Sequence, residues 1–129
     1  MDNVIGDKSF KFAIRIVKLC KYLSAEKNEF ILSKQLIKSG TSVGANVKEG
    51  IYAQSKNDFI SKMNIALKEI VETEYWLELM IATDIISKTE GESLLNDCIE
   101  LKRILHSIVK TSKSKNNGDS FATQNFELI

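Results

Sequence analysis

Apolar residues return along this chain at spacings of three and four, which places them on one face of an α-helix. The first predicted helix covers residues 8–23, and its apolar stripe is Phe12, Ile16, Leu19 and Leu23. Phe10 is expected to widen that stripe. A turn is predicted over residues 24–27.

A second apolar stripe passes through the glycine-rich segment 35–50. Each glycine weakens a helix interior by about 1 kcal/mol relative to alanine. Because apolar residues still recur there in helical register, we expect a helix. The close approach of a neighbouring helix should offset the conformational cost of Gly40 and Gly44. This helix is predicted to begin between Glu26 and Glu29 and to end near Ala53.

Serines mark the starts of two further helices. Ser55 precedes the third helix and can accept a hydrogen bond from its free amides. The apolar seam of that helix has spacings of four and three over three heptads, with one polar member: Phe59, Met63, Ala66, Ile70, Thr73, Leu77 and Met80. Ser87 opens a Ser-Lys-Thr-Glu capping box, which predicts a fourth helix over residues 87–112.

Four amphipathic helices joined by short turns predict an all-α fold, an antiparallel up-down-up-down four-helix bundle. The bundle is expected over residues 8–112, after a flexible N-terminus over residues 1–7. Residues 113–129 are expected to form a disordered tail with a short apolar end, Phe121–Ile129. That end is either an accidental terminus or a motif that docks on a partner or on a neighbouring subunit.

No apolar run is long enough to span a membrane, and the N-terminus lacks the pattern of a signal peptide. We therefore expect a cytoplasmic protein that does not associate with a membrane.

The net charge of +1 conceals an uneven distribution along the chain. Residues 8–24 carry only basic charges, residues 69–100 are mostly acidic, and residues 102–115 are basic again. If the first and last helices pack side by side, their bases would form one positive surface: Lys8, Lys11, Arg15, Lys18, Lys102, Arg103, Lys110 and Lys113. Such a surface is a candidate for binding RNA phosphates or for joining the acidic face of the next subunit in a ring, or it is simply solvated.

Four polar residues fall beside the apolar positions of the second and third helices: Asn46, Glu49, Glu69 and Glu72. A buried amide or carboxylate needs hydrogen-bond partners. We expect a structural polar network that holds the two helices in register, and a polar pocket or an intersubunit contact is the alternative.

The residue types give no support to catalysis. A di-iron bundle needs two Glu-x-x-His motifs, and the chain has one histidine, His106. Cys20 and Cys98 fall at apolar helix positions without a local base, so reduced thiols are expected there. We predict no catalytic residue, no metal and no cofactor.

Several segments together resemble a known family. They are Gln35-Leu36, the glycine-rich residues Ser39–Gly50, Lys56–Phe59, Ala66–Glu69 and Glu72–Leu77. Across residues 10–109 the chain resembles the 23S rRNA intervening-sequence proteins, bacterial four-helix bundles encoded within large-subunit ribosomal RNA genes. It is also similar in fold to the accessory variability proteins of diversity-generating retroelements.

The resemblance implies an antiparallel bundle that assembles as a homo-oligomeric ring, typically a pentamer, without catalytic activity. It also implies a basic surface for a reverse transcriptase and its RNA. The expected function is a non-enzymatic oligomeric scaffold or adaptor for structured RNA or for a nucleic-acid enzyme such as a reverse transcriptase. The alternative is a protein-only assembly module whose ring or C-terminal tail docks a protein partner.

Overall fold

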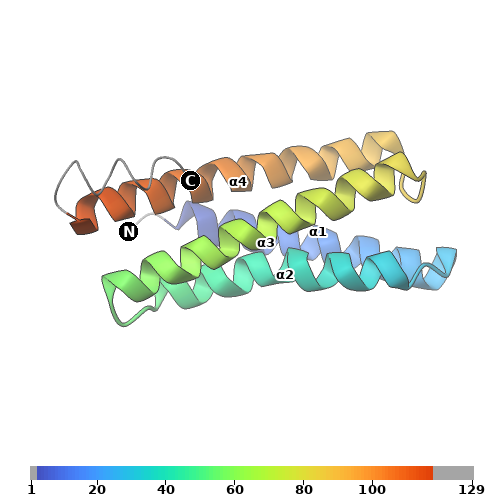
Figure 1. Ribbon diagram of the computed structural model, residues 1–129. Helices are drawn as coiled ribbons and strands as arrows, with labels where there is room; N and C mark the ends of the chain where they lie inside the picture. The colour runs from blue at the N-terminus through green and yellow to red at the C-terminus, as the bar shows by residue number, and fades with distance from the viewer. Residues whose placement is uncertain (1–2, 118–129) are drawn as a thin grey trace.

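The computed structural model describes residues 3–117, with side chains as far as Ser114. Its four α-helices are α1 (Val4–Lys27), α2 (Ile31–Ile51), α3 (Lys56–Ala82) and α4 (Lys88–Asn117). Consecutive helices are antiparallel and joined by short turns, and each helix packs against two neighbours in the cyclic order α1, α2, α3, α4 (Figure 1). The predicted four-helix bundle is confirmed, and the described part of the chain contains no strand.

The heptad positions of α3 lie at the centre of the core. Six of the seven predicted residues are fully buried, namely Met63, Ala66, Ile70, Thr73, Leu77 and Met80. The predicted stripe of α1 is buried too, and each such large apolar side chain stabilises the fold by about 1.5–3 kcal/mol. Phe10 is different, with 67% of its surface exposed, because a position two residues before Phe12 lies about 200° away around the helix.

The glycines of α2 allow α1 to pack closely, as predicted. A Cβ atom on Gly40 would lie 2.9 Å from Ile16 Cγ2, and one on Gly44 would lie 3.4 Å from the Ser9 carbonyl oxygen. The conformational cost of these glycines is therefore offset by contact between the two helices.

Four of the predicted helix boundaries are wrong, among them both ends of α1 and the start of α2. α1 begins at Val4 rather than at residue 8 and continues through the predicted turn to Lys27. The residue that caps this end is Asn28, which has a left-handed φ of 53° and donates its backbone N–H to the Leu23 carbonyl. The Glu29 carboxylate accepts hydrogen bonds from backbone amides of the first turn of α2, including one from Ser33 N–H at 2.8 Å. Glu29 therefore lies before the helix, and α2 begins later than predicted.

The two serine caps are confirmed. Ser55 Oγ accepts a hydrogen bond from Asp58 N–H at 3.1 Å, and Ser87 Oγ accepts one from Glu90 N–H at 3.2 Å. α4 continues to Asn117, so residues 113–117, predicted to be disordered, are helical. Ser112 is still 92% buried, which shows that this end of α4 remains packed. Residues 118–129 lie outside the described part of the chain.

α4 is the longest helix and projects past the start of α1 (Figure 1). The ion pair between Lys8 and Glu100 places the first turns of α1 beside the middle of α4. From that level, α4 extends about 20 Å beyond the first residue of α1 at 1.5 Å per residue.

Candidate nucleic-acid and protein-binding surfaces

The basic residues of α1 bind acidic residues of α4. Arg15 donates from Nη1 to Asp97 Oδ2 at 2.6 Å and from Nη2 to Ser93 Oγ at 3.0 Å. Lys8 Nζ lies 3.3 Å from Glu100 Oε2. The acidic half of α4 therefore lies against the basic stripe of α1. The prediction that the bases of both helices form one positive surface is wrong.

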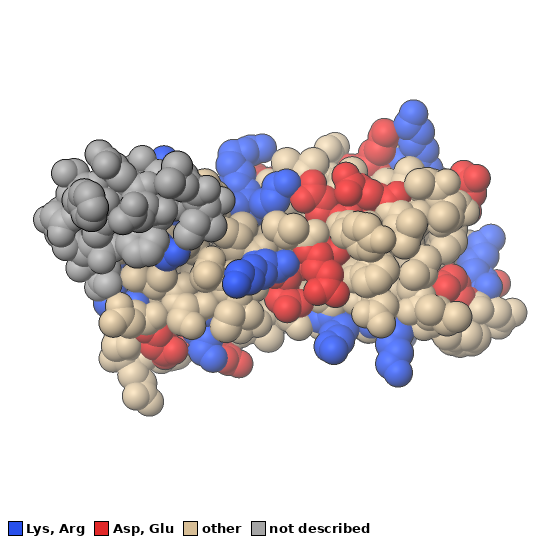
Figure 2. Space-filling model, viewed as in Figure 1, with Lys and Arg blue, Asp and Glu red and all other residues tan. Residues whose placement is uncertain are grey.

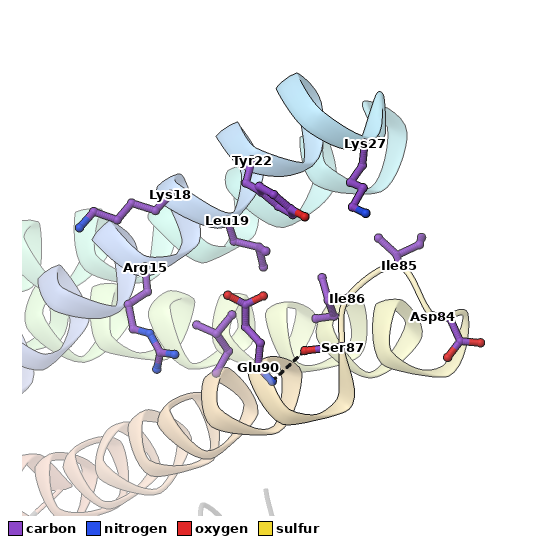
Figure 3. A pocket seen from close by; sticks show the side chains of 11 residues that line it. Arg15, Lys18, Leu19, Tyr22, Lys27, Asp84, Ile85, Ile86, Ser87 and Glu90 are labelled. Atoms are coloured by element: carbon purple, nitrogen blue, oxygen red, sulfur yellow. Dashed lines mark hydrogen bonds between the residues drawn. The ribbon is translucent and has the colours of Figure 1, made fainter.

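A cleft of about 720 Å³ separates the second half of α1 from the start of α4 (Figure 3). Arg15 and Lys18 line one wall, while the Glu90 carboxylate points across the cleft toward α1 and Asp84 lies at its rim. Charges of both signs face this space, so it is not a simple anion site. Lys11 and Lys18 are exposed and form no ion pair with any described carboxylate.

The basic residues of the second half of α4 lie away from α1. Lys102 Nζ lies 2.8 Å from Glu74 Oε1 of α3. Arg103 and Lys110 are exposed, and Lys113 is half-buried. Figure 2 shows acidic side chains gathered over the middle of α3 and α4, with basic side chains toward both ends of this face. The predicted bases thus belong to two separate regions of the molecule.

A shallow groove of about 440 Å³ runs along the outer face of α3 and α4. Its apolar floor is Leu67, Val71 and Ile99, and its rim is Lys102, Arg103 and His106. Val71 is 49% exposed. We call this feature the α3–α4 groove.

The four residues of the predicted polar network are not joined. Asn46 Nδ2 donates to the Ser42 carbonyl of its own helix, Glu49 pairs with Lys62 at 2.9 Å, and Glu72 accepts a hydrogen bond from Trp76 Nε1. Among the described residues, no hydrogen bond connects any two of the four, so the predicted network is wrong.

Glu69 stands apart from the other three because its protonation is perturbed. Burial raises the pKa of this carboxyl, and the nearby Glu72 raises it further, while Lys38 of α2 opposes both effects. The interaction with Lys38 places Glu69 at the edge between α2 and α3.

A different polar contact joins α2 and α3 inside the core. Thr73 Oγ1 lies 2.9 Å from Ser39 Oγ and 2.8 Å from the Glu69 carbonyl oxygen, and both hydroxyl-bearing residues are at least 99% buried. The sequence contained a signal for this pair, because Thr73 is the one polar member of an otherwise apolar seam. A polar residue at such a position indicates a partner on the facing helix.

The basic half of the bundle is formed by α1 and α2 rather than by α1 and α4. Residues 3–52 contain nine basic and four acidic residues, a net charge of +5, whereas residues 53–117 contain nine basic and ten acidic residues, a net charge of −1. Seven exposed lysines of this half form no ion pair with a described carboxylate: Lys11, Lys18, Lys21, Lys27, Lys34, Lys38 and Lys48. The sequence prediction missed the three on α2.

Exposed aromatic residues accompany these lysines. Lys21 and Lys34 line a groove between α1 and α2 together with Phe30, which is 58% exposed. A second groove of about 730 Å³, which we call the α1–α2 groove, includes Phe10, Tyr52 and Lys48. Tyr52 is 77% exposed. Large apolar side chains gathered on an exposed face are typical of interaction surfaces.

The two cysteines are poor nucleophiles. Both are free and buried, and burial raises the pKa of the Cys20 thiol to about 11 and that of Cys98 to about 12. A thiol that stays protonated does not act as a nucleophile or as a metal ligand.

Over residues 3–117 no group of three or more potential ligands is arranged to hold a metal ion. No described helix is long and apolar enough to cross a membrane.

Both a family model and a solved structure are similar to this chain. A family model described as 23S rRNA-intervening sequence protein matches residues 1–107. The crystal structure of a protein with unknown function from the S23 ribosomal protein family of Bacteroides thetaiotaomicron is 55% identical to the chain. That match covers 83% of this chain and 99% of the other, with a TM-score of 0.81. No curated protein matches the chain.

Proposed function

The chain belongs to the 23S rRNA-intervening sequence protein family, and we propose that it works as a non-enzymatic, homo-oligomeric scaffold that binds structured RNA. The proposed assembly is a ring, and a pentamer is the size that the resemblance of the sequence implies. A nucleic-acid enzyme such as a reverse transcriptase is the proposed user of the scaffold, and the cytoplasm is its proposed location.

The observation that carries the RNA proposal is the unequal charge of the two halves of the bundle. The seven lysines of α1 and α2 without an ion pair are exposed, and the aromatic rings of Phe10, Phe30 and Tyr52 lie on the same half. Lysines bind phosphates through charge, and exposed aromatic rings stack on unpaired bases. RNA loops present both features.

Oligomerisation would make a modest surface effective. A single protomer offers few phosphate contacts, so its affinity would be low at physiological salt. A ring repeats the surface once per protomer, and linked contacts increase avidity without any new contact in each protomer.

RNA binding is tested with charge reversal on the α1–α2 half. The double variant Lys21→Glu/Lys34→Glu changes two lysines of one groove that lie outside the ion pairs between α1 and α4. Fluorescence anisotropy with a structured RNA, measured from 50 to 200 mM salt, should show weaker binding. The magnitude of the slope of log K against log salt should fall by about 1.4–1.8, because each of the two lost phosphate contacts removes about 0.7–0.9.

The matched control is Lys56→Glu/Lys88→Glu, which makes the same charge change at exposed helix starts of the other half. It should retain most of the affinity and the salt slope. An equal loss in both variants would show that only net charge matters, and no loss in the first variant would reject the α1–α2 half as the RNA site.

A protein-only assembly module is the second candidate, and the outer face of α3 favours it. This face carries the acidic residues Glu72 and Glu78 beside Val71 and Tyr75, which are 49% and 56% exposed. The α1–α2 half has the opposite charge and its own exposed aromatic residues. Two unlike, complementary faces on one protomer form the kind of interface that closes a ring.

Native mass spectrometry separates the two candidates. If the faces join subunits, Lys21→Glu/Lys34→Glu should dissociate the ring and Glu72→Lys/Glu78→Lys should do the same. Combining all four substitutions should restore it, because the charges again complement each other. If the ring persists in both double variants while RNA affinity falls in the first, the RNA scaffold is supported. A monomeric wild-type protein would contradict both candidates.

A further inference from the structure

We infer that the α3–α4 groove is a docking site for the chain's own C-terminal segment, with Phe126 and Leu128 on its apolar floor and Glu127 at its basic rim. This inference is independent of the proposed RNA function. It concerns a part of the chain beyond the family match, which ends at residue 107.

The first argument is the chemistry of the groove. Its floor is apolar, and its volume of about 440 Å³ suits one or two large side chains. Arg103 and His106 are exposed at its rim, and neither forms an ion pair with a described carboxylate. An occupant that matches this groove is apolar, short and negatively charged.

The C-terminal segment has this chemistry. Residues 118–129 contain two acidic residues, Asp119 and Glu127, and no basic residue. Phenylalanine, leucine and isoleucine gather at the end of the segment, after a polar stretch of the chain. The carboxylate of Glu127 falls between two apolar residues, so one short stretch can contact the floor and the rim together.

The second argument is reach. The groove residues Ile99–His106 lie 11 to 18 positions before Asn117 on the same helix, which is about 17–27 Å from its end at 1.5 Å per residue. An extended chain spans at most about 3.3–3.6 Å per residue, so Phe126 can lie about 30 Å from Asn117. Phe121 can lie only about 14 Å away, short of the groove. The next residue in the sequence is Gly118, and a glycine allows backbone conformations that reverse the chain at little steric cost.

The α1–α2 groove is a poorer match for the same segment. Its lining includes the acidic residues Asp7 and Glu49, which would repel Glu127. Its other wall is on α2, which does not pack against α4, the helix that carries the segment. Charge therefore favours the α3–α4 groove, which lies on α4 itself.

The occupied groove would be closed to other proteins. A partner that used the same floor and rim would have to displace the segment, and such a partner would itself present an acidic, aromatic stretch. The segment would thus act as a built-in competitor at this surface.

Paramagnetic NMR on the full chain tests the inference. A nitroxide is attached to the variant Ile129→Cys, while the buried Cys20 and Cys98 stay unlabelled under native conditions. Strong loss of amide signal is expected at Val71, Ile99 and Arg103. The signals of Ala13 and Gly44, in the other groove, should be retained. Loss centred on the α1–α2 groove, or no localised loss, would overturn the inference.

Two test variants, a control for each and one mixture complete the experiment. Phe126→Ser and Arg103→Glu should each abolish most of the signal loss, whereas Phe121→Ser and Lys88→Glu, the matched controls, should leave it intact. A mixture of nitroxide-labelled protein with isotope-labelled, nitroxide-free protein should show no loss. Signal loss in the mixture would mean that a second copy occupies the groove and would overturn docking within one chain.

Discussion

Gly40 and Gly44 should respond in opposite ways to the same substitution. Gly40→Ala removes a helix cost of about 1 kcal/mol. It also places a methyl group 2.9 Å from Cγ2 and 3.0 Å from Cγ1 of Ile16. These atoms belong to a fully buried β-branched side chain with few alternative rotamers. Overpacking of this kind costs about 1–3 kcal/mol, so we expect a net destabilisation of about 1 kcal/mol.

Gly44→Ala is the matched control. Its new methyl group would meet the Ser9 carbonyl oxygen at 3.4 Å, an ordinary van der Waals contact. The helix gain of about 1 kcal/mol is then retained. The two variants, measured by urea denaturation at one protein concentration, should differ by about 2 kcal/mol in the free energy of unfolding, with unchanged m-values.

A double-mutant cycle identifies the cause. Ile16→Ala alone should cost about 2–5 kcal/mol, because it leaves a cavity. In that background the Cγ atoms are gone, so Gly40→Ala should become stabilising, with a coupling of about 2 kcal/mol. If Gly40→Ala and Gly44→Ala were equally stable, the close packing of α1 on Gly40 would be refuted.

Three further perturbations test other contacts. Thr73→Val should lower the free energy of unfolding by about 1–2 kcal/mol by leaving the buried Ser39 hydroxyl poorly bonded, and Ser39→Ala/Thr73→Val should cost less than the two single variants together. Arg15→Gln should cost less than about 1 kcal/mol in urea denaturation, and the effect should shrink in 1 M salt, because exposed ion pairs are weak and screened. Cys20 and Cys98 should react slowly with a thiol reagent at pH 8, and fast labelling without denaturant would contradict their burial. Because the pKa of Cys98 rises from 9.0 to about 12 on folding, the folded state binds its proton more tightly, and that stabilisation should be present below pH 9 and lost as the pH rises toward 12.

The buried faces of the helices could be predicted from the sequence because they depend on local spacing alone. The four stripe residues of α1 are core residues, and so are six of the seven seam residues of α3. The capping serines are equally local signals. The start of α2 was missed because an acidic residue such as Glu29 suits both the first turn of a helix and the position before it. The end of α1 was missed because it depends on the positive φ of Asn28, which the spacing of apolar residues does not indicate.

The charged surfaces were predicted less well, because their composition depends on how each helix is rotated and shifted against its neighbour. The four bases of α1 were correctly seen as one stripe, but Arg15 and Asp97 are 82 residues apart, and no spacing rule indicates that they meet. The same register decides that Lys102 binds Glu74. The lysines of α2 were overlooked although Lys34 and Lys38 lie one helical turn apart.

The packing order of the helices has a consequence for folding kinetics. Three of the four interfaces join consecutive helices, and the α1–α4 interface, the only one between helices distant in sequence, is the least closely packed. Contacts between consecutive helices form without closing a long loop, and loop closure has an entropic cost that slows folding. Such a topology therefore favours rapid folding. The α2–α3 and α3–α4 hairpins are then the natural nucleus. We expect the contact of α1 with α4 to close the bundle last, with its ion pairs contributing little to the rate-limiting barrier.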